Sequence, residues 1–483
     1  MVFSSAIFIF CFLPLCLLGY YLVPKRFRNY FFLFMSILFY AYGEPKFVFV
    51  MLLSVLANWV FGLLANRYRT QKTAIRWVLA AMAVFNVGIL FAYKYLNFVI
   101  ENVNTVFHMQ LPKTELLLPI GLSFVTFQAM SYVIDIYRGS AQSQKSLPNT
   151  ALYILMFPPL IAGPIVRYET VADQITNRTT RADDFSRGVR RFIFGFAKKA
   201  IVANSVAITA DEIFSNSNFW SLTVLTAWIG ILCYTLQIYF DFSGYSDMAI
   251  GLGLMFGFHF RENFNYPYIS KTVTEFWRRW HISLSSWFRD YVYFPLGGSR
   301  VRTKGRLVFN LFVVWMLTGI WHGASWNFVL WGFFYFVLLT FEKLFGIPGK
   351  VAGNPVLAIL YRLFTILCFT VGWVIFRAPD IGSALKYTQI LFLGRYGFNK
   401  VMLLDGDALY YLAQNWVILL IAIIGCTPAV KWAYHRVKAG LRENNGGLLA
   451  VQISENVICL VLFVIALAFM ASGQYNPFIY FNF

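Results

Sequence analysis

Residues 307–341 read LVFNLFVVWMLTGIWHGASWNFVLWGFFYFVLLTF and contain no Asp, Glu, Lys or Arg. A helix that crosses a membrane needs about 20 apolar residues, so this stretch is too long for a single crossing. We therefore expect a turn near Gly323, Ala324 and Ser325, with one helix on each side. The turn would directly follow His322, one of only five histidines in the chain.

An ionisable side chain among apolar helices is costly and is a functional hypothesis by default. A second histidine, His281, lies in the sequence FWRRWHISLS at 276–285. Apolar residues recur every three or four positions over 272–294, which predicts one amphipathic helix. A helix lying on the membrane surface would account for its Trp and Arg content. The presence of His281 and Asp290 favours a helix that lines the floor of a cavity.

The composition defines the fold class. Of 483 residues, 59% are hydrophobic and 13% are charged, and the mean hydropathy is +0.63. Long continuous apolar runs predict an all-α polytopic membrane protein rather than a transmembrane barrel of short alternating strands. The formal charge of +19 is concentrated in short loops, so positive-inside bias explains it better than nucleic-acid binding. The six cysteines lie within apolar runs without metal-ligand spacing, which indicates packing roles.

The charge pattern also predicts the orientation. Residues 1–24 carry no charge, and cations follow at Lys25, Arg26 and Arg28. This order is typical of a retained first helix with the N-terminus outside, not of a cleaved signal peptide. The basic loops at 67–76 and 300–306 would then lie in the cytoplasm.

Three stretches interrupt the regular pattern of crossings. Residues 151–165 contain Phe-Pro-Pro and Gly-Pro, which predict a broken or re-entrant helix, and the polar run 167–191 predicts a solvated cytoplasmic connection. A crossing at 219–240 leads into QIYFDFSGYSD at 237–247, which we place at a helix junction. This junction is either an interfacial aromatic belt with capping residues or the wall of a cavity that orients a polar substrate.

Several motifs resemble one known family. They are MVFSS (1–5), PIGLSFVTFQ (119–128), YVIDIYRG (132–139), FDFSGYSD (240–247), NFNYPY (263–268), FWRRWHISLS (276–285) and GIWHG (319–323). In this order they resemble the membrane-bound O-acyltransferase (MBOAT) family, and within it the bacterial alginate O-acetyltransferase branch. The resemblance implies a ring of roughly 10–12 transmembrane helices, with re-entrant and amphipathic helices, around a central tunnel. It also implies one integral membrane acyltransferase domain over 1–483, with a motif-bearing core at about 116–341.

The resemblance further implies an O-acetyltransferase of the bacterial cytoplasmic (inner) membrane. The donor would be a cytoplasmic thioester, acetyl-CoA, and the acceptor a hydroxyl of an exported polysaccharide or of peptidoglycan. Because no Gly-x-Ser-x-Gly motif is present, we favour a periplasmic partner protein that completes the transfer. Membrane lipids would surround the chain, and neither a metal nor nucleic acid is expected. A D-alanyl or long-chain acyl donor is the alternative, and a transporter is a more distant one.

Ester formation needs a base for the acceptor hydroxyl and a donor for the tetrahedral oxyanion. We assign the base, or a nucleophile that carries the acetyl group, to His322. His281, Arg279 or the Trp280 N–H would orient it or stabilise the oxyanion. The expected substrate- and tunnel-lining residues are Gln237, Tyr239, Asp241, Ser243, Tyr245, Trp277, Arg278, Arg279, Trp280, Ser283, Arg289, Trp321 and Asn327.

Overall fold

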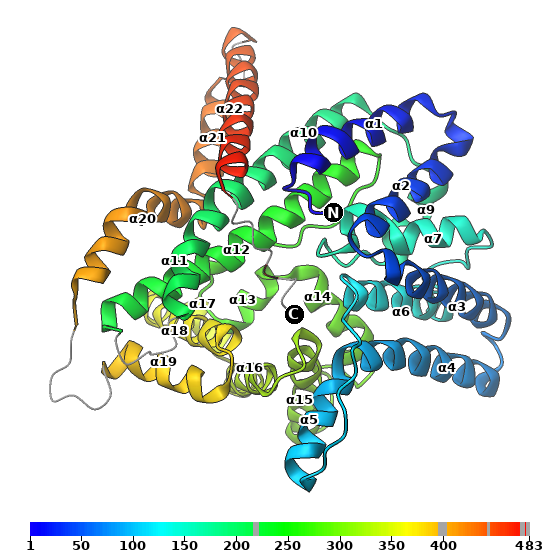
Figure 1. The fold of residues 1–483 in the computed structure, drawn as a ribbon, viewed down its shortest axis with the longest axis horizontal. Helices are drawn as coiled ribbons and strands as arrows, with labels where there is room; N and C mark the ends of the chain where they lie inside the picture. The colour runs from blue at the N-terminus through cyan, green and yellow to red at the C-terminus, as the bar shows by residue number, and fades with distance from the viewer. Residues whose placement is uncertain (216–221, 395–402, 442–444, 474–478, 480–483) are drawn as a thin grey trace. The chain divides into compact units, whose positions relative to one another are not determined.

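The computed structural model describes residues 1–215, 222–394, 403–441, 445–473 and Ile479. Helices, and no strands, form the regular structure of these described residues (Figure 1). The chain forms two compact units. The first unit comprises Met1–Phe192 and Tyr245–Glu262, and the second comprises Ile193–Gly244 and Asn263–Phe483.

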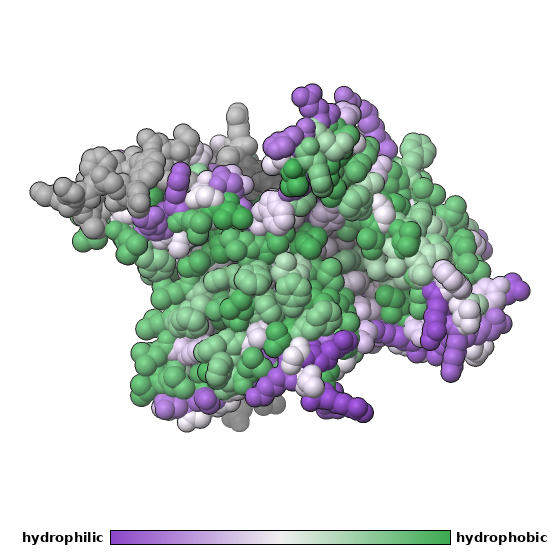
Figure 2. Space-filling view, turned by 90° about the horizontal axis from the view of Figure 1, so that it is seen from below, coloured by the Kyte–Doolittle hydropathy of each residue, from purple (hydrophilic) through white to green (hydrophobic). Residues whose placement is uncertain are grey.

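The prediction of an all-α polytopic membrane protein is confirmed. Within the described residues, eight helical stretches are long and apolar enough to cross a membrane. Apolar side chains also dominate the face seen in Figure 2, with hydrophilic ones gathered toward its upper and lower edges. The larger number of crossings, the ring and the single domain remain predictions. The eight stretches are Pro45–Arg67, Lys72–Phe107, Ala182–Ser215, Val224–Met255, Trp326–Leu344, Pro355–Arg377, Gly406–Gly425 and Gly446–Ser472.

In the first unit, helices α3, α4 and α6 pack against one another (Figure 1). Asn58 of α3 and Asn86 of α4 exchange two side-chain hydrogen bonds of 3.0 and 2.9 Å, and both residues are buried. Such amide pairs join helices where no water can replace the partner. The helices of this unit are η1 (Ile7–Phe12), α1 (Leu13–Leu22), η2 (Lys25–Phe27), α2 (Arg28–Gly43), η3 (Pro45–Phe47), α3 (Val48–Arg67), α4 (Lys72–Leu90), η4 (Phe91–Tyr95), α5 (Leu96–Phe107), α6 (Leu122–Arg138), α7 (Leu147–Leu155), α8 (Phe157–Leu160), α9 (Tyr168–Asn177), the first part of α10 (Ala182–Ala197) and the end of α12 (Val224–Met255) from Tyr245.

The predicted helix break in 151–165 is confirmed. Helix α7 ends at Leu155, and Met156 leaves the helical conformation with ψ 118° before the short α8 begins. Two prolines follow in α8, and neither has an N–H for a helical hydrogen bond. The polar run 167–191 is more helical than expected, because α9 and the start of α10 occupy most of it.

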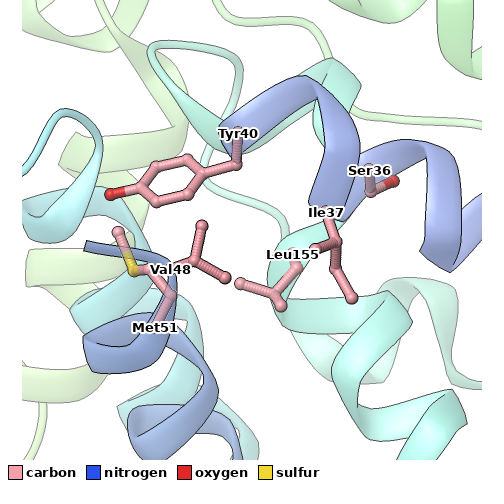
Figure 3. Close-up of a pocket in the computed structure, with 6 residues that line it drawn as sticks. All are labelled: Ser36, Ile37, Tyr40, Val48, Met51 and Leu155. Carbon is pink, nitrogen blue, oxygen red and sulfur yellow. The ribbon is translucent and has the colours of Figure 1, made fainter. Parts of the chain in front are cut away.

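A small pocket in the first unit lies among α2, α3 and α7. Figure 3 shows its six lining side chains, and none of them is a candidate site residue. Aliphatic and Met side chains supply most of the lining, so the pocket offers little polar chemistry. The lining residues are Ser36, Ile37, Tyr40, Val48, Met51 and Leu155.

The second unit contains the predicted turn. Helix α15 (Lys304–His322) ends at His322, and α16 (Trp326–Leu344) begins three residues after Gly323. The two backbones approach closely, because a Cβ on Gly332 would lie only 2.5 Å from the Trp315 carbonyl oxygen. The remaining helices are η5 (Lys198–Ala203), α11 (Asn204–Ser215), α12 (Val224–Met255, to Gly244 in this unit), α13 (Val273–Arg279), α14 (Ile282–Phe288), η8 (Arg289–Tyr293), α17 (Ile347–Gly353), α18 (Pro355–Arg377), α19 (Ile381–Leu393), α20 (Gly406–Gly425), α21 (Ala429–Gly440) and α22 (Asn445–Ser472).

Two local predictions were wrong. Residues 237–247 are not a helix junction but lie inside the continuous helix α12. Of the crossing expected at 219–240, the first three residues lie outside the described residues. The polar residues there do not end the helix because side chains project away from its backbone hydrogen bonds. Residues 272–294 do not form one helix either, because the chain leaves the helical conformation at Trp280 and His281.

Candidate active site

The backbone of His281 has an unusual conformation. Its φ of 43° is in the left-handed region, which costs a non-glycine residue about 1–3 kcal/mol. Two main-chain hydrogen bonds of 2.9 Å hold this bend: Ile282 N–H donates to the Asn263 carbonyl, and Asn265 N–H donates to the Arg279 carbonyl. Residues held in this way cluster at functional sites, which supports a role for His281.

Asn263 orients the imidazole of His281. Its side-chain Oδ1 accepts hydrogen bonds from the backbone N–H of Ser283 at 3.1 Å and from the Ser283 hydroxyl at 2.9 Å. Because a backbone N–H can only donate, the atom that faces it must be the amide oxygen. The same oxygen lies 3.1 Å from Nδ1 of His281, so Nδ1 is the donor. This tautomer leaves the lone pair on Nε2.

Aromatic rings surround His281. Phe242 of α12 packs edge-on against it with ring centroids 4.6 Å apart, and the Trp321 ring lies at 6.3 Å. Only 1% of His281 is exposed. Burial lowers its pKa well below the usual value, and a positive charge on His322 would lower it further. The imidazole is therefore neutral at physiological pH.

His322, the last residue of α15, is enclosed by aromatic rings of its own unit. The centroids of Trp321, Trp331 and Phe376 lie 5.0, 5.0 and 5.2 Å from its ring, all nearly perpendicular to it. Trp321 thus contacts both imidazoles. The structure brings the two predicted catalytic histidines to one aromatic cluster.

Other predicted site residues belong to the same cluster. Trp277 packs edge-on against Trp331 at 5.4 Å and against Tyr335 at 4.8 Å. Trp280 contacts Trp373 at 4.9 Å and Tyr239 at 6.2 Å. Together with Trp321 and Ser283, three further predicted residues therefore lie near the histidines or the rings around them: Tyr239, Trp277 and Trp280.

The predicted arginines are not buried beside the histidines. Arg278 and Arg289 are exposed, and Arg289 pairs with Asp290 at 2.7 Å. Arg279 forms an ion pair with Glu275 at 2.8 Å and donates to the Asn265 carbonyl.

Three of the remaining predicted residues make structural contacts. Asp241 forms a buried ion pair with Lys199 at 2.8 Å. Asn327 donates to the carbonyl of Ala378 at 2.5 Å. Tyr245 belongs to the first unit, where its ring stacks on Phe3 at 4.6 Å.

Some buried polar atoms of the second unit have no hydrogen-bond partner among the described residues. Two of them are acceptor-capable oxygens on α12, Gln237 Oε1 and Ser243 Oγ. Two others are indole N–H donors, Trp277 Nε1 and Trp331 Nε1. A buried polar group without a partner is costly, so such atoms point to water or to a substrate. Within the described part of the chain, no three His, Cys, Asp or Glu side chains are placed to hold a metal ion.

Sequence reasoning missed four residues that shape this site. Asn263 was visible in the NFNYPY motif but had no assigned role, and Lys199 was not assigned one either. Glu342 is the first charged residue after the uncharged run 307–341, a signal that could have identified it. Trp331 is one of 14 tryptophans, and only the fold shows that it contacts His322.

Comparison with known proteins identifies the class. The sequence model of the MBOAT, membrane-bound O-acyltransferase family, matches residues 78–346. A probable alginate O-acetylase AlgI of Pseudomonas putida is 40% identical over 494 residues, covering 100% of both chains. A peptidoglycan O-acetyltransferase of Helicobacter pylori is 32% identical over 526 residues, covering 100% of this chain and 98% of the relative.

A teichoic acid D-alanyltransferase of Bacillus subtilis is 32% identical over 254 residues, which cover 48% of this chain and 62% of the relative. The helical membrane fold and these matches define an acyltransferase of the membrane. The chain belongs to the membrane-bound O-acyltransferase family, as its motifs predicted.

Proposed function

We propose that this protein moves an acetyl group from cytoplasmic acetyl-CoA to a hydroxyl of an exported polysaccharide or of peptidoglycan. The observation that supports this most strongly is the pair of buried imidazoles, His281 and His322, which share contacts with Trp321. The acceptor hydroxyl is the nucleophile in this scheme, and a neutral imidazole can act as the general base that removes its proton.

In the proposed reaction, His322 removes the proton of the acceptor hydroxyl as its oxygen attacks the thioester carbonyl. The C–S bond then breaks, and the CoA thiolate takes up the proton. His322 acting as the nucleophile that first carries the acetyl group is the alternative. His281, whose Nδ1 is engaged by Asn263, would orient a group of the substrate in the site.

The structure changes our expectation for the oxyanion donors. Arg279 is engaged by Glu275 and the Asn265 carbonyl, so it is a poor candidate. The indole N–H groups of Trp331, which packs on His322, and of Trp277, which packs on Trp331, are better candidates. Both are buried, and no described residue accepts a hydrogen bond from either. Gln237 and Ser243 would bind hydroxyl groups of the acceptor.

Acetyl is preferred over D-alanyl as the transferred group. The alginate and peptidoglycan relatives align with the whole chain, whereas the D-alanyltransferase of Bacillus subtilis aligns with 48% of it. We place the protein in the bacterial inner membrane with its N-terminus outside, because its basic loops then lie in the cytoplasm. In this scheme, a periplasmic partner protein receives the acetyl group and completes the transfer. The competing hypothesis is a transporter that carries out no acyl transfer.

The test uses purified protein in nanodiscs and acetyl-CoA labelled in the acetyl group. Label should reach an alginate or peptidoglycan acceptor, or a periplasmic partner, with the wild type, and His322→Gln should abolish the transfer. His281→Asn is the better variant at the second position, because Asn tolerates the left-handed backbone that Ala would strain. Full activity of folded His322→Gln would contradict the mechanism, and turnover with D-alanyl donors alone would contradict the donor.

A further inference from the structure

A buried carboxylate anchors the segment that carries His281. Glu342, on α16, has 0% exposure. Its Oε1 accepts a hydrogen bond from Val273 N–H at 2.7 Å, and its Oε2 accepts one from Thr274 N–H at 2.7 Å. These are the first two N–H groups of α13, which lack partners within the helix.

The rest of the α13 start is also fixed. The Thr272 hydroxyl accepts from Glu275 N–H at 3.1 Å, and the Glu275 side chain accepts from Lys271 N–H at 2.8 Å, which resembles a capping box whose return bond goes to the residue before the N-cap. Helix α13 has only seven residues, far fewer than the roughly 12–15 that an isolated helix needs. Its position therefore depends on tertiary anchors, and Glu342 is the α16 side chain that hydrogen-bonds to its first N–H groups.

Helix α16 also contacts the other histidine. Its Trp331 packs on His322 with ring centroids 5.0 Å apart, and the same indole contacts Trp277 of α13 at 5.4 Å. Helix α16 thus contacts both parts of the site: Glu342 near its end holds the start of α13, and Trp331 nearer its beginning packs on His322. The end of α13 leads through Trp280 directly into His281.

We propose that Glu342 is a positioning residue for acyl transfer: by fixing the start of α13 on α16, it holds His281 in place relative to His322. This inference rests on the proposed function only for its catalytic consequence. The anchoring itself is a structural statement that can be measured without any substrate.

The variant Glu342→Gln tests both parts. The Gln side chain keeps one acceptor and turns an NH₂ group toward the other backbone N–H, so one of the two hydrogen bonds is lost. Asp405→Asn is the matched control, because Asp405 Oδ1 caps a different helix, α20, by accepting from Ala408 N–H at 2.9 Å. Hydrogen exchange of the peptide covering 271–281 is measured together with kcat and KM for acetyl-CoA.

We expect faster exchange of the 271–281 peptide in Glu342→Gln only. Because a misplacement of about 1 Å can cost about 100-fold in rate, we expect kcat to fall at least tenfold while KM changes less than about twofold. In a His281→Asn background, Glu342→Gln should lower the residual rate no further. Unchanged exchange, an unchanged kcat, or an equal fall in the His281→Asn background would overturn the proposal. An inactive wild type would contradict the proposed function instead, and the exchange arm would still decide the anchoring.

Discussion

Removing one charge of the buried ion pair between Lys199 and Asp241 should strongly destabilise the second unit. The Nζ and Oδ1 atoms of the pair are 2.8 Å apart, and the two side chains are 3% and 1% exposed. At this distance and an effective dielectric constant of about 20, the attraction is about 6 kcal/mol. Removing one partner leaves the other charge buried without a counter-charge, which typically lowers the free energy of unfolding by about 3–5 kcal/mol. We expect this loss in Asp241→Asn and in Lys199→Met.

The double variant separates a buried charge from a packing defect. Lys199→Met with Asp241→Asn removes both charges, and the Asn carbonyl can still accept the Ile479 N–H that Asp241 Oδ2 accepts at 2.9 Å. Replacing both charges of a buried pair is often neutral or stabilising. We therefore expect the double variant to lie within about 1 kcal/mol of the wild type, with a strong favourable coupling in the double-mutant cycle.

The assay is a denaturant titration in detergent micelles, followed by tryptophan fluorescence. The exposed pair of Lys113 and Glu101 supplies the control, since Lys113→Met should change the free energy of unfolding by at most about 1 kcal/mol. Single variants at Lys199 and Asp241 that are as stable as wild type would refute the reasoning. A double variant whose loss of unfolding free energy equals the sum of the two single losses would also refute it.

Three further outcomes follow from contacts in the two units. Gly332→Ala should push α15 and α16 apart and destabilise the protein by about 1–3 kcal/mol in the same titration, whereas Gly349→Ala, with no atom within 4 Å of the new Cβ, should not. Asn263→Ala should lower kcat at least about tenfold, because Ser283 and His281 lose their shared hydrogen-bond acceptor. Asn265 is exposed, so Asn265→Ala should leave kcat unchanged, and equal rates for the two variants would contradict the role of Asn263. Asn86→Leu should cost about 0.6–1.7 kcal/mol, as a broken interhelical hydrogen bond in a membrane does, and a stability gain would contradict that role.

The sequence was sufficient for the membrane helices and for the turn after His322. Hydropathy over about 20 residues decides both, because every backbone hydrogen bond inside a membrane must be made within the helix. The polar residues at 237–247 led to a wrong prediction, because a helix keeps its backbone hydrogen bonds whether its side chains are polar or apolar. They suggested a helix end, but Asp241 lies within α12 and finds Lys199 as its partner, which requires no break.

The bend at His281 could not be predicted from its neighbours. The periodicity of 272–294 suits a single helix, and the interruption comes from residues 263–265, whose backbone groups pair with Arg279 and Ile282. The same limit applies to the candidate site. Sequence motifs named both histidines, whereas the contributions of Asn263 and Glu342 depend on tertiary contacts across tens of residues.

The left-handed backbone of His281 can persist only if several neighbours impose it. Three separate elements do so: Asn263 holds the imidazole, Phe242 of α12 packs on its ring, and Glu342 of α16 anchors the helix before it. Because each anchor is one of several, loss of one should leave the fold standing while the imidazole moves. Activity should therefore respond more strongly than stability to each of these substitutions, which is the behaviour expected of a preorganised catalytic site and not of a packing core.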